Sequence, residues 1–309
     1  MIYAYLGPVG TFTWIALGQV EAAKGEEWLA VNNVGDALAA VTTGRADAAM
    51  IAVENSVEGG VSAAQDALAA SSGLQILGEY LVPVNFDVVG RPGSKLEESG
   101  VVIAHPVAYA QCREWLEKTL KQHQHLPTTS NVAAVNELLG SDRGDFAIAP
   151  HGYGEHENVE TLASNIGDNA NAVTRFVLIG SRRPVPDRTG YDKTTVIVEL
   201  PDDRPGGLVE MLEQFSTRGV NLSLLESRPI GDELGRYRFV IDINGHIEDE
   251  RVADALLGLK RYSPGLQFLG SYRRADGHRP EVPTQHSDES FVLARQWLTD
   301  IRNGTESKS

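Results

Sequence analysis

The sequence has little of three things: cysteine, positive charge and long hydrophobic runs. Its single cysteine, Cys112, excludes an intrachain disulfide and a zinc site made of cysteines. Lys and Arg number 27 against 42 Asp and Glu, and the resulting net charge of −15 makes nucleic acid and anionic membranes poor partners. No apolar run approaches the roughly 18 residues of a membrane-spanning helix, and the first residues show no charged leader. We therefore expect a cytoplasmic protein that binds neither nucleic acid nor membrane.

What the chain does have is enough length and apolar content for two or three domains, with 309 residues of which 42% are hydrophobic. Up to about residue 183, buried strands alternate with helices. This pattern predicts an α/β fold with a mostly parallel sheet, whose ligands bind beyond the carboxyl ends of the strands.

Small polar residues stand where we expect helices to begin, near positions 13, 56 and 130. Helix N-termini and hydroxyl groups can together bind a small anion without many Lys or Arg side chains. An acidic chain could bind an anionic substrate in this way. The residues at these positions, either helix caps or ligand donors, are Thr11, Thr13, Asn55, Ser56, Thr129 and Ser130.

A further candidate is the loop-to-strand junction Thr174-Arg175-Phe176. Arg175 offers a planar fork of donors that matches a carboxylate, and the Thr174 hydroxyl can both donate and accept a hydrogen bond. Taken alone, a Thr-Arg pair at a strand start is more often ordinary surface. Glu54 and His105 are the titratable alternatives, and residues in such places are more often structural.

The pattern changes after a Pro-rich, charged linker at 184–192. Residues 193–274 read strand, helix, strand, strand, helix, strand, which is the ferredoxin-like βαββαβ order. We expect the tail at 275–309 to be largely disordered, with one short helix within 291–301.

Over residues 1 to about 274 the chain resembles the prephenate dehydratases, because six motifs stand in that family's order, and its βαββαβ segment resembles an ACT domain. The motifs are Gly7-Pro8-Val9-Gly10-Thr11-Phe12-Thr13, Glu54-Asn55-Ser56-Val57-Glu58-Gly59, His105-Pro106, Thr129-Ser130, Thr174-Arg175-Phe176 and Glu226-Ser227-Arg228-Pro229. The resemblance implies a two-lobed, periplasmic-binding-protein-like catalytic domain over 1–183. One lobe would span about 1–76 with 175–183, and the other 77–174.

The resemblance also implies a function, the decarboxylating dehydration of prephenate to phenylpyruvate in L-phenylalanine biosynthesis, with no metal or cofactor. Thr174 and Arg175 would be catalytic. The implied substrate-binding residues are Thr11, Thr13, Asn55, Ser56, Thr129, Ser130 and Phe176.

In this family the ACT domain binds L-phenylalanine as a feedback inhibitor, between paired copies. We therefore expect a homo-oligomer, either a dimer or a tetramer. The family's GALV motif appears here with Gly in place of Ala. The implied effector-binding residues are Gly206, Gly207, Leu208, Val209, Asn221, Glu226, Ser227 and Arg228.

Two other interpretations stay open. An arogenate dehydratase would use the same motifs on a substrate with an amine in place of the keto group. A small-anion-binding sensor with an ACT domain would need no catalysis, but it leaves Thr174-Arg175 and the polar junctions of the first domain without a role.

Overall fold

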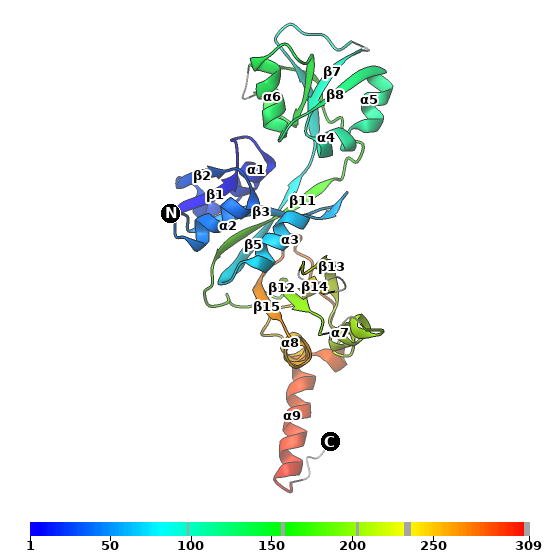
Figure 1. Cartoon of the computed structure of the whole chain (residues 1–309). Helices are drawn as coiled ribbons and strands as arrows, with labels where there is room; N and C mark the ends of the chain where they lie inside the picture. The colour runs from blue at the N-terminus through cyan, green and yellow to red at the C-terminus, as the bar shows by residue number, and fades with distance from the viewer. Residues whose placement is uncertain (98, 156–157, 202–203, 232–235, 306–309) are drawn as a thin grey trace. The chain divides into compact units, whose positions relative to one another are not determined.

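The computed structural model describes all residues except 98, 156–157, 202–203, 232–235 and 306–309 (Figure 1). The chain forms two compact units. The first contains Met1–Ala64 and Tyr80–Leu178, and the second contains Gln65–Glu79 and Ile179–Ser309. No helix in the described part of the chain is both long enough and apolar enough to cross a membrane.

The first sheet has the strand order β2-β1-β3-β11-β5, and the short β4 pairs with β3. Strand β1 is parallel to both β2 and β3, as the alternating pattern of strands and helices predicts. The strands are β1 (Ile2–Leu6), β2 (Glu27–Val31), β3 (Ala48–Asn55), β4 (Gly59–Gly60), β5 (Leu74–Pro83) and β11 (Val173–Ser181). The helices that follow them are α1 (Phe12–Gly18), η1 (Glu21–Ala23), α2 (Val34–Thr42) and α3 (Ser62–Ala70).

The second sheet has the order β10-β6-β9-β7-β8, with β7 parallel to β8 and β9. Its strands are β6 (Phe86–Gly90), β7 (Ser99–Ala104), β8 (Gln122–Pro127), β9 (Phe146–Pro150) and β10 (Glu160–Ala163). Its helices are α4 (Pro106–Gln111), α5 (Arg113–Thr119), α6 (Asn131–Gly140) and η2 (Tyr153–Glu155).

The inner strands β6 and β9 of the second sheet are buried on both faces, which explains their largely apolar sequences. Val102 packs into the core with α4 and α5, whereas its neighbour Ile103 packs into the core with α6. Figure 1 shows α5 and α6 on either side of β7 and β8. The two sheets together confirm the expected two-lobed α/β domain.

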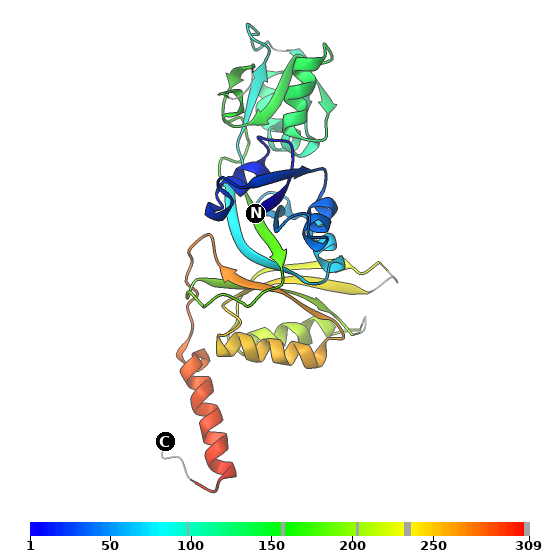
Figure 2. The ribbon, with the colours of Figure 1, turned by 90° about the vertical axis from the view of Figure 1, so that its left-hand side faces the viewer.

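The second unit contains a four-stranded antiparallel sheet of order β13-β14-β12-β15, and Figure 2 shows α7 and α8 on one of its faces. This topology confirms the βαββαβ prediction. The elements are β12 (Asp192–Glu199), α7 (Gly207–Ser216), β13 (Leu222–Pro229), β14 (Tyr237–Asn244), α8 (Glu250–Tyr262), β15 (Leu266–Arg273), η3 (Thr284–His286) and α9 (Asp288–Arg302).

Two segments differ from the sequence-based expectation. Residues 65–76, grouped with the first lobe from the sequence, belong to the second unit, where Gln267 Nε2 donates to the carbonyls of Leu68 and Ser71. Helix α9 is longer than the short helix expected within 291–301. Ser287 caps it by accepting a hydrogen bond from Ser290 N, and acidic residues in its first turn favour that end of a helix.

Candidate active site

A cavity of about 380 Å³ lies in the first unit. Segments at the carboxyl ends of the parallel strands β1, β3, β7 and β8 contribute to its wall, which is where ligands of α/β sheets bind. Of the substrate-site residues expected from the sequence, the wall contains Thr11, Thr13, Asn55, Thr129, Ser130, Thr174 and Phe176.

Thr174 and Asn55, which are far apart in the sequence, meet in this wall. Asn55 Oδ1 accepts hydrogen bonds from the backbone N–H groups of Val57 (2.8 Å) and Glu58 (3.4 Å). Because those groups can only donate, the amide is oriented with Nδ2 facing Thr174, and Nδ2 donates to Thr174 Oγ1 at 2.8 Å. The Thr174 oxygen is therefore an acceptor in this contact, which leaves its own O–H available to donate.

Arg175 and Ser56 do not line the cavity. Successive side chains of a strand point to opposite faces, so Thr174 and Phe176 face the cavity while Arg175 faces away. Arg175 Nε donates to Glu54 Oε2 at 2.8 Å, and the Arg175 side chain is only 8% exposed. Ser56 Oγ accepts from Val173 N at 2.9 Å, which ties the end of β3 to the start of β11.

Helices begin at two of the three expected places. Thr11 caps α1 and Ser130 caps α6, each through a side-chain oxygen that accepts a backbone N–H. The expectation of a helix start near residue 56 is wrong. Residues 56–58 form the turn between β3 and β4, because Asn55 Oδ1 stabilises a turn and β4 pairs back onto β3; α3 begins only at Ser62.

Gln111 and Asn131 also line the cavity, and the sequence analysis missed both. Gln111 is 8% exposed, and within the described part of the chain neither its amide nitrogen nor its amide oxygen has a hydrogen-bond partner. The Asn131 oxygen is also buried and has no partner among those residues. The signal that could have found Gln111 is its spacing, because His105, Ala108 and Gln111 recur every three residues and all three line the cavity.

The cavity wall is nearly free of charge. Among the described residues that line it, Glu58 is the acidic one and no Lys or Arg is present. Burial lowers the pKa of His105 below its ordinary value, although the nearby Glu58 carboxylate opposes that shift. His105 Nδ1 accepts from Val107 N at 3.3 Å, so the neutral ring carries its proton on Nε2. The wall thus offers neutral donors and acceptors.

The expected effector residues lie on two elements of the second unit. Gly206 adopts a φ of +87°, which favours glycine, and directly precedes α7, whose Leu208 and Val209 are exposed. On β13, Glu226 Oε2 accepts from Gln65 Nε2 of α3 at 2.8 Å.

Arg228, also on β13, donates through Nη2 to Asp66 of α3 at 2.7 Å. This bond lowers the pKa of the Asp66 carboxyl. Asn221 and Ser227 are exposed.

Comparison with known proteins places these observations in a family. Residues 3–184 match the family model "Prephenate dehydratase" and residues 194–261 match "ACT domain". The chain is 39% identical to the prephenate dehydratase of Amycolatopsis methanolica over 307 residues, which is 98% of this chain and 99% of the relative.

Two solved structures extend the comparison. Prephenate dehydratase from Arthrobacter aurescens, in complex with L-Phe, is 46% identical with a TM-score of 0.93, over 98% of this chain and 100% of that one. GqqA, described as a quorum-quenching acylase, is 30% identical with a TM-score of 0.76, over 91% of this chain and 100% of that one.

Proposed function

The chain belongs to the prephenate dehydratase family, and we propose that Thr174, oriented by Asn55, assists the departure of the ring hydroxyl in that reaction. The reaction converts prephenate to phenylpyruvate, carbon dioxide and water. The bond from the ring to its carboxylate breaks, its electron pair enters the ring, and the C–O bond breaks as hydroxide leaves. One proton, supplied by solvent, completes the water molecule.

The observation that carries this role is the direction of the Asn55–Thr174 hydrogen bond, at 2.8 Å. Since Asn55 donates, the Thr174 O–H can donate to the leaving oxygen, where negative charge develops. A threonine hydroxyl is too weak an acid to give up its proton near pH 7, so Thr174 stabilises the leaving hydroxide by hydrogen bonding. One such donor typically contributes about 3–4 kcal/mol to a transition state.

The carboxylates of prephenate need other partners, since no Lys or Arg stands among the described residues of the wall. We assign them the Gln111 amide N–H, which has no hydrogen-bond partner among the residues that the structure describes. The N-terminus of α6 at Ser130 and Asn131 supplies a second set of donors. Arg175 then acts indirectly, because its bond to Glu54 holds the strand end that carries Asn55.

The acylase name of one structural relative suggests a different chemistry for a cavity of this type. Acyl transfer by a threonine needs a base within hydrogen-bond reach of the hydroxyl. The group that contacts Thr174 Oγ1 is the Asn55 amide nitrogen, which donates and cannot take up a proton. This geometry favours the dehydration.

The test is turnover of prephenate by Thr174→Val and Thr174→Ser. Val keeps the shape but loses the donor, so we expect kcat to fall about 10²–10³-fold. Ser keeps the donor and should retain most of the activity. Thr174→Ser should unfold near the wild-type temperature, whereas Thr174→Val should unfold somewhat lower because Asn55 Nδ2 loses its acceptor, so the activities are compared well below both transitions. Wild-type turnover by Thr174→Val would rule out the assignment, and parallel assays with arogenate and with an acylated amine test the other substrates.

We further propose that L-phenylalanine regulates this enzyme at its ACT domain, through the segments 206–209 and 226–228 and Asn221. The bonds of Gln65 to Glu226 and of Asp66 to Arg228 support a route to the cavity. Both partners lie on α3, which follows the β3–β4 turn that contains Asn55. Effector binding that shifts α3 would thereby move Asn55.

We also propose that the chain acts in the cytoplasm as a homo-oligomer with paired ACT domains. The free, fully buried Cys112, whose thiol pKa is raised by burial, is compatible with a reducing compartment.

A further inference from the structure

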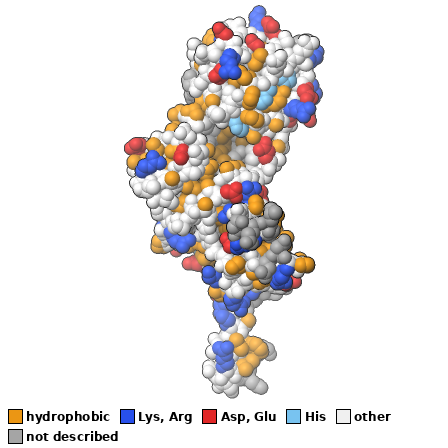
Figure 3. Space-filling model, viewed as in Figure 1, with side chains coloured by type: hydrophobic (Ala, Val, Ile, Leu, Met, Phe, Trp, Pro, Cys, Tyr) orange, Lys and Arg blue, Asp and Glu red, His pale blue; other side chains and the backbone are white. Residues whose placement is uncertain are grey.

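Helix α9 presents an apolar face that nothing in the described chain covers. None of its residues is buried, and Leu293, Trp297, Leu298 and Ile301 are 61%, 56%, 43% and 52% exposed. On a helix these residues and Ala294 fall within one stripe. Figure 3 shows hydrophobic side chains on the surface of this helix, at the lower end of the view.

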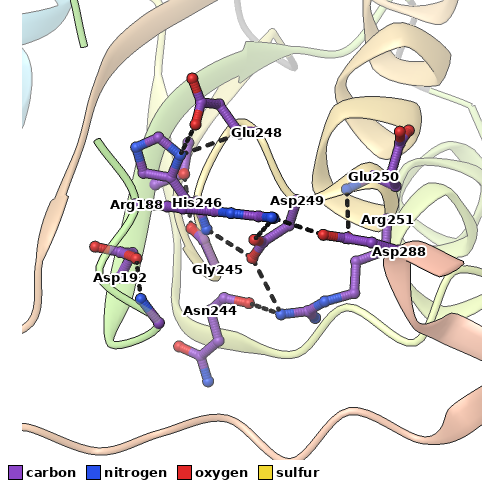
Figure 4. A network of polar contacts seen from close by, with 12 residues as sticks. Arg188, Asp192, Asn244, Gly245, His246, Glu248, Asp249, Glu250, Arg251 and Asp288 are labelled. Atoms are coloured by element: carbon purple, nitrogen blue, oxygen red, sulfur yellow. Dashed lines mark hydrogen bonds and ion pairs between the residues drawn. The ribbon is translucent and has the colours of Figure 1, made fainter. Parts of the chain in front are cut away.

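The opposite side of α9 is anchored to its own unit by charged groups. Asp288 accepts a hydrogen bond from the Glu250 backbone N–H at 2.9 Å. Asp288 also forms an ion pair with Arg188 at 2.5 Å, and the same Arg188 nitrogen lies 3.6 Å from Asp249 Oδ1 (Figure 4). Two turns further on, Arg295 binds the Glu250 carboxylate with both of its terminal nitrogens. These contacts hold the helix by its polar side, so its apolar stripe is preformed and faces outward.

The spacing of the stripe suits a second copy of the same helix. Four of its five residues, Ala294, Trp297, Leu298 and Ile301, stand three, one and three positions apart, so their spacing is the same from either end, and Leu293 lies outside this symmetric set. In an antiparallel pair about a two-fold axis, the small Ala294 faces the larger Ile301 of the second copy. At the centre, Trp297 of each copy faces Leu298 of the other. We propose that α9 pairs with α9 of a second copy in this way.

Charge also favours a second copy. From Asp288 to Arg302 the helix has three acidic and two basic residues, a net charge of −1, whereas the whole chain carries −15. Two α9 helices can therefore approach without the repulsion that other surfaces would produce. A membrane is a poorer partner, because interfacial helices place many Lys and Arg on the polar face and here Arg295 is already paired with Glu250.

The test uses single cysteines placed along α9 of the full-length protein, in which the native Cys112 is buried. Leu298→Cys lies beside the proposed axis, and mild oxidation should link two copies. Gln296→Cys, on the polar side, is the matched control and should not link. Ala294→Cys alone should link poorly, but a mixture of Ala294→Cys and Ile301→Cys proteins should link well, because antiparallel pairing joins those positions.

Adding Trp297→Asp to Leu298→Cys should abolish the crosslink, while adding Gln296→Glu should leave it. Equal linking at 296 and 298 would overturn the proposal, as would strong linking of Ala294→Cys to itself, which indicates a parallel pair. Cosedimentation with phosphatidylcholine–phosphatidylglycerol vesicles that is lost in Trp297→Asp would instead assign the face to a membrane. None of these readouts depends on catalysis, so their outcome is independent of the role proposed for Thr174.

Discussion

Two buried polar side chains, Gln111 in the cavity wall of the first unit and Lys193 in the sheet of the second, differ in how their hydrogen-bonding groups are satisfied. In the sheet, the buried Lys193 Nζ lies 2.9 Å from Glu79 Oε2 and 3.9 Å from Asp242 Oδ2, both of which are also buried. In the cavity, the Gln111 amide is also buried, and none of the described residues supplies it with a hydrogen-bond partner. A buried polar group without a partner costs stability, so its presence marks a place where a ligand can supply the bond.

The largest effect on stability should come from breaking the paired charges. Lys193→Met leaves the Glu79 carboxylate buried without its cation, and we expect the free energy of unfolding to fall by about 3–5 kcal/mol. Denaturant unfolding of the second unit measures this. The control is Lys24→Met, which breaks the surface pair with Glu21 and should cost less than about 1 kcal/mol. Similar losses in the two variants would show that the buried pair contributes no more to stability than the exposed one.

Gln111→Leu should change stability and activity in opposite directions. Leu has a similar size and removes a polar group whose burial without a partner costs about 1–3 kcal/mol, so the variant should be more stable than the wild type. It also removes a donor to an anionic substrate, so kcat/KM should fall by about 10–100-fold, since such a bond contributes about 1.5–3 kcal/mol. Lower stability with normal activity would show that Gln111 serves the fold.

The sequence predicts the fold better than it predicts the site. Strand periodicity and turn residues are local, so they predict both sheets of the first unit and the βαββαβ unit. Side chains alternate between the two faces of a strand, so Thr174 and Arg175 point in opposite directions, although their adjacency in one motif suggests a shared role. The bond between Thr174 and Asn55 and the unpartnered state of Gln111 depend on residues brought together only by folding, so no local pattern reports them.

The contacts between α3 and the proposed effector-binding segment 226–228 allow a smaller test, on regulation. Asp66→Asn weakens the bond to Arg228, and we expect the L-phenylalanine concentration for half-inhibition to rise about two- to five-fold, because the Asp66 side chain is 44% exposed and such pairs contribute less than about 1 kcal/mol. Uninhibited turnover should not change. The matched control is Asp254→Asn, which breaks the similarly exposed pair with Arg218 inside the second unit. An equal response in both variants would exclude α3 as the route.

The smallest effect concerns His105, whose pKa is lowered by burial in the cavity wall. In the unfolded chain this imidazole takes up a proton below about pH 6.5, whereas in the folded protein it stays neutral to lower pH. The unfolded state therefore binds more protons in that window, and stability falls as the pH decreases from 6.5 towards the lowered pKa.

His105→Asn removes the titrating group and keeps a residue that can accept the Val107 N–H at the start of α4. Its unfolding free energy should depend less on pH between 5 and 7 than that of the wild type, and His278→Asn, a substitution of an exposed histidine, serves as the control. A slope unchanged by His105→Asn would mean that the ring is as easily protonated in the folded wall as in water. The cavity would then present a cation at mildly acid pH, and it would no longer contrast with the charged interior of the second unit.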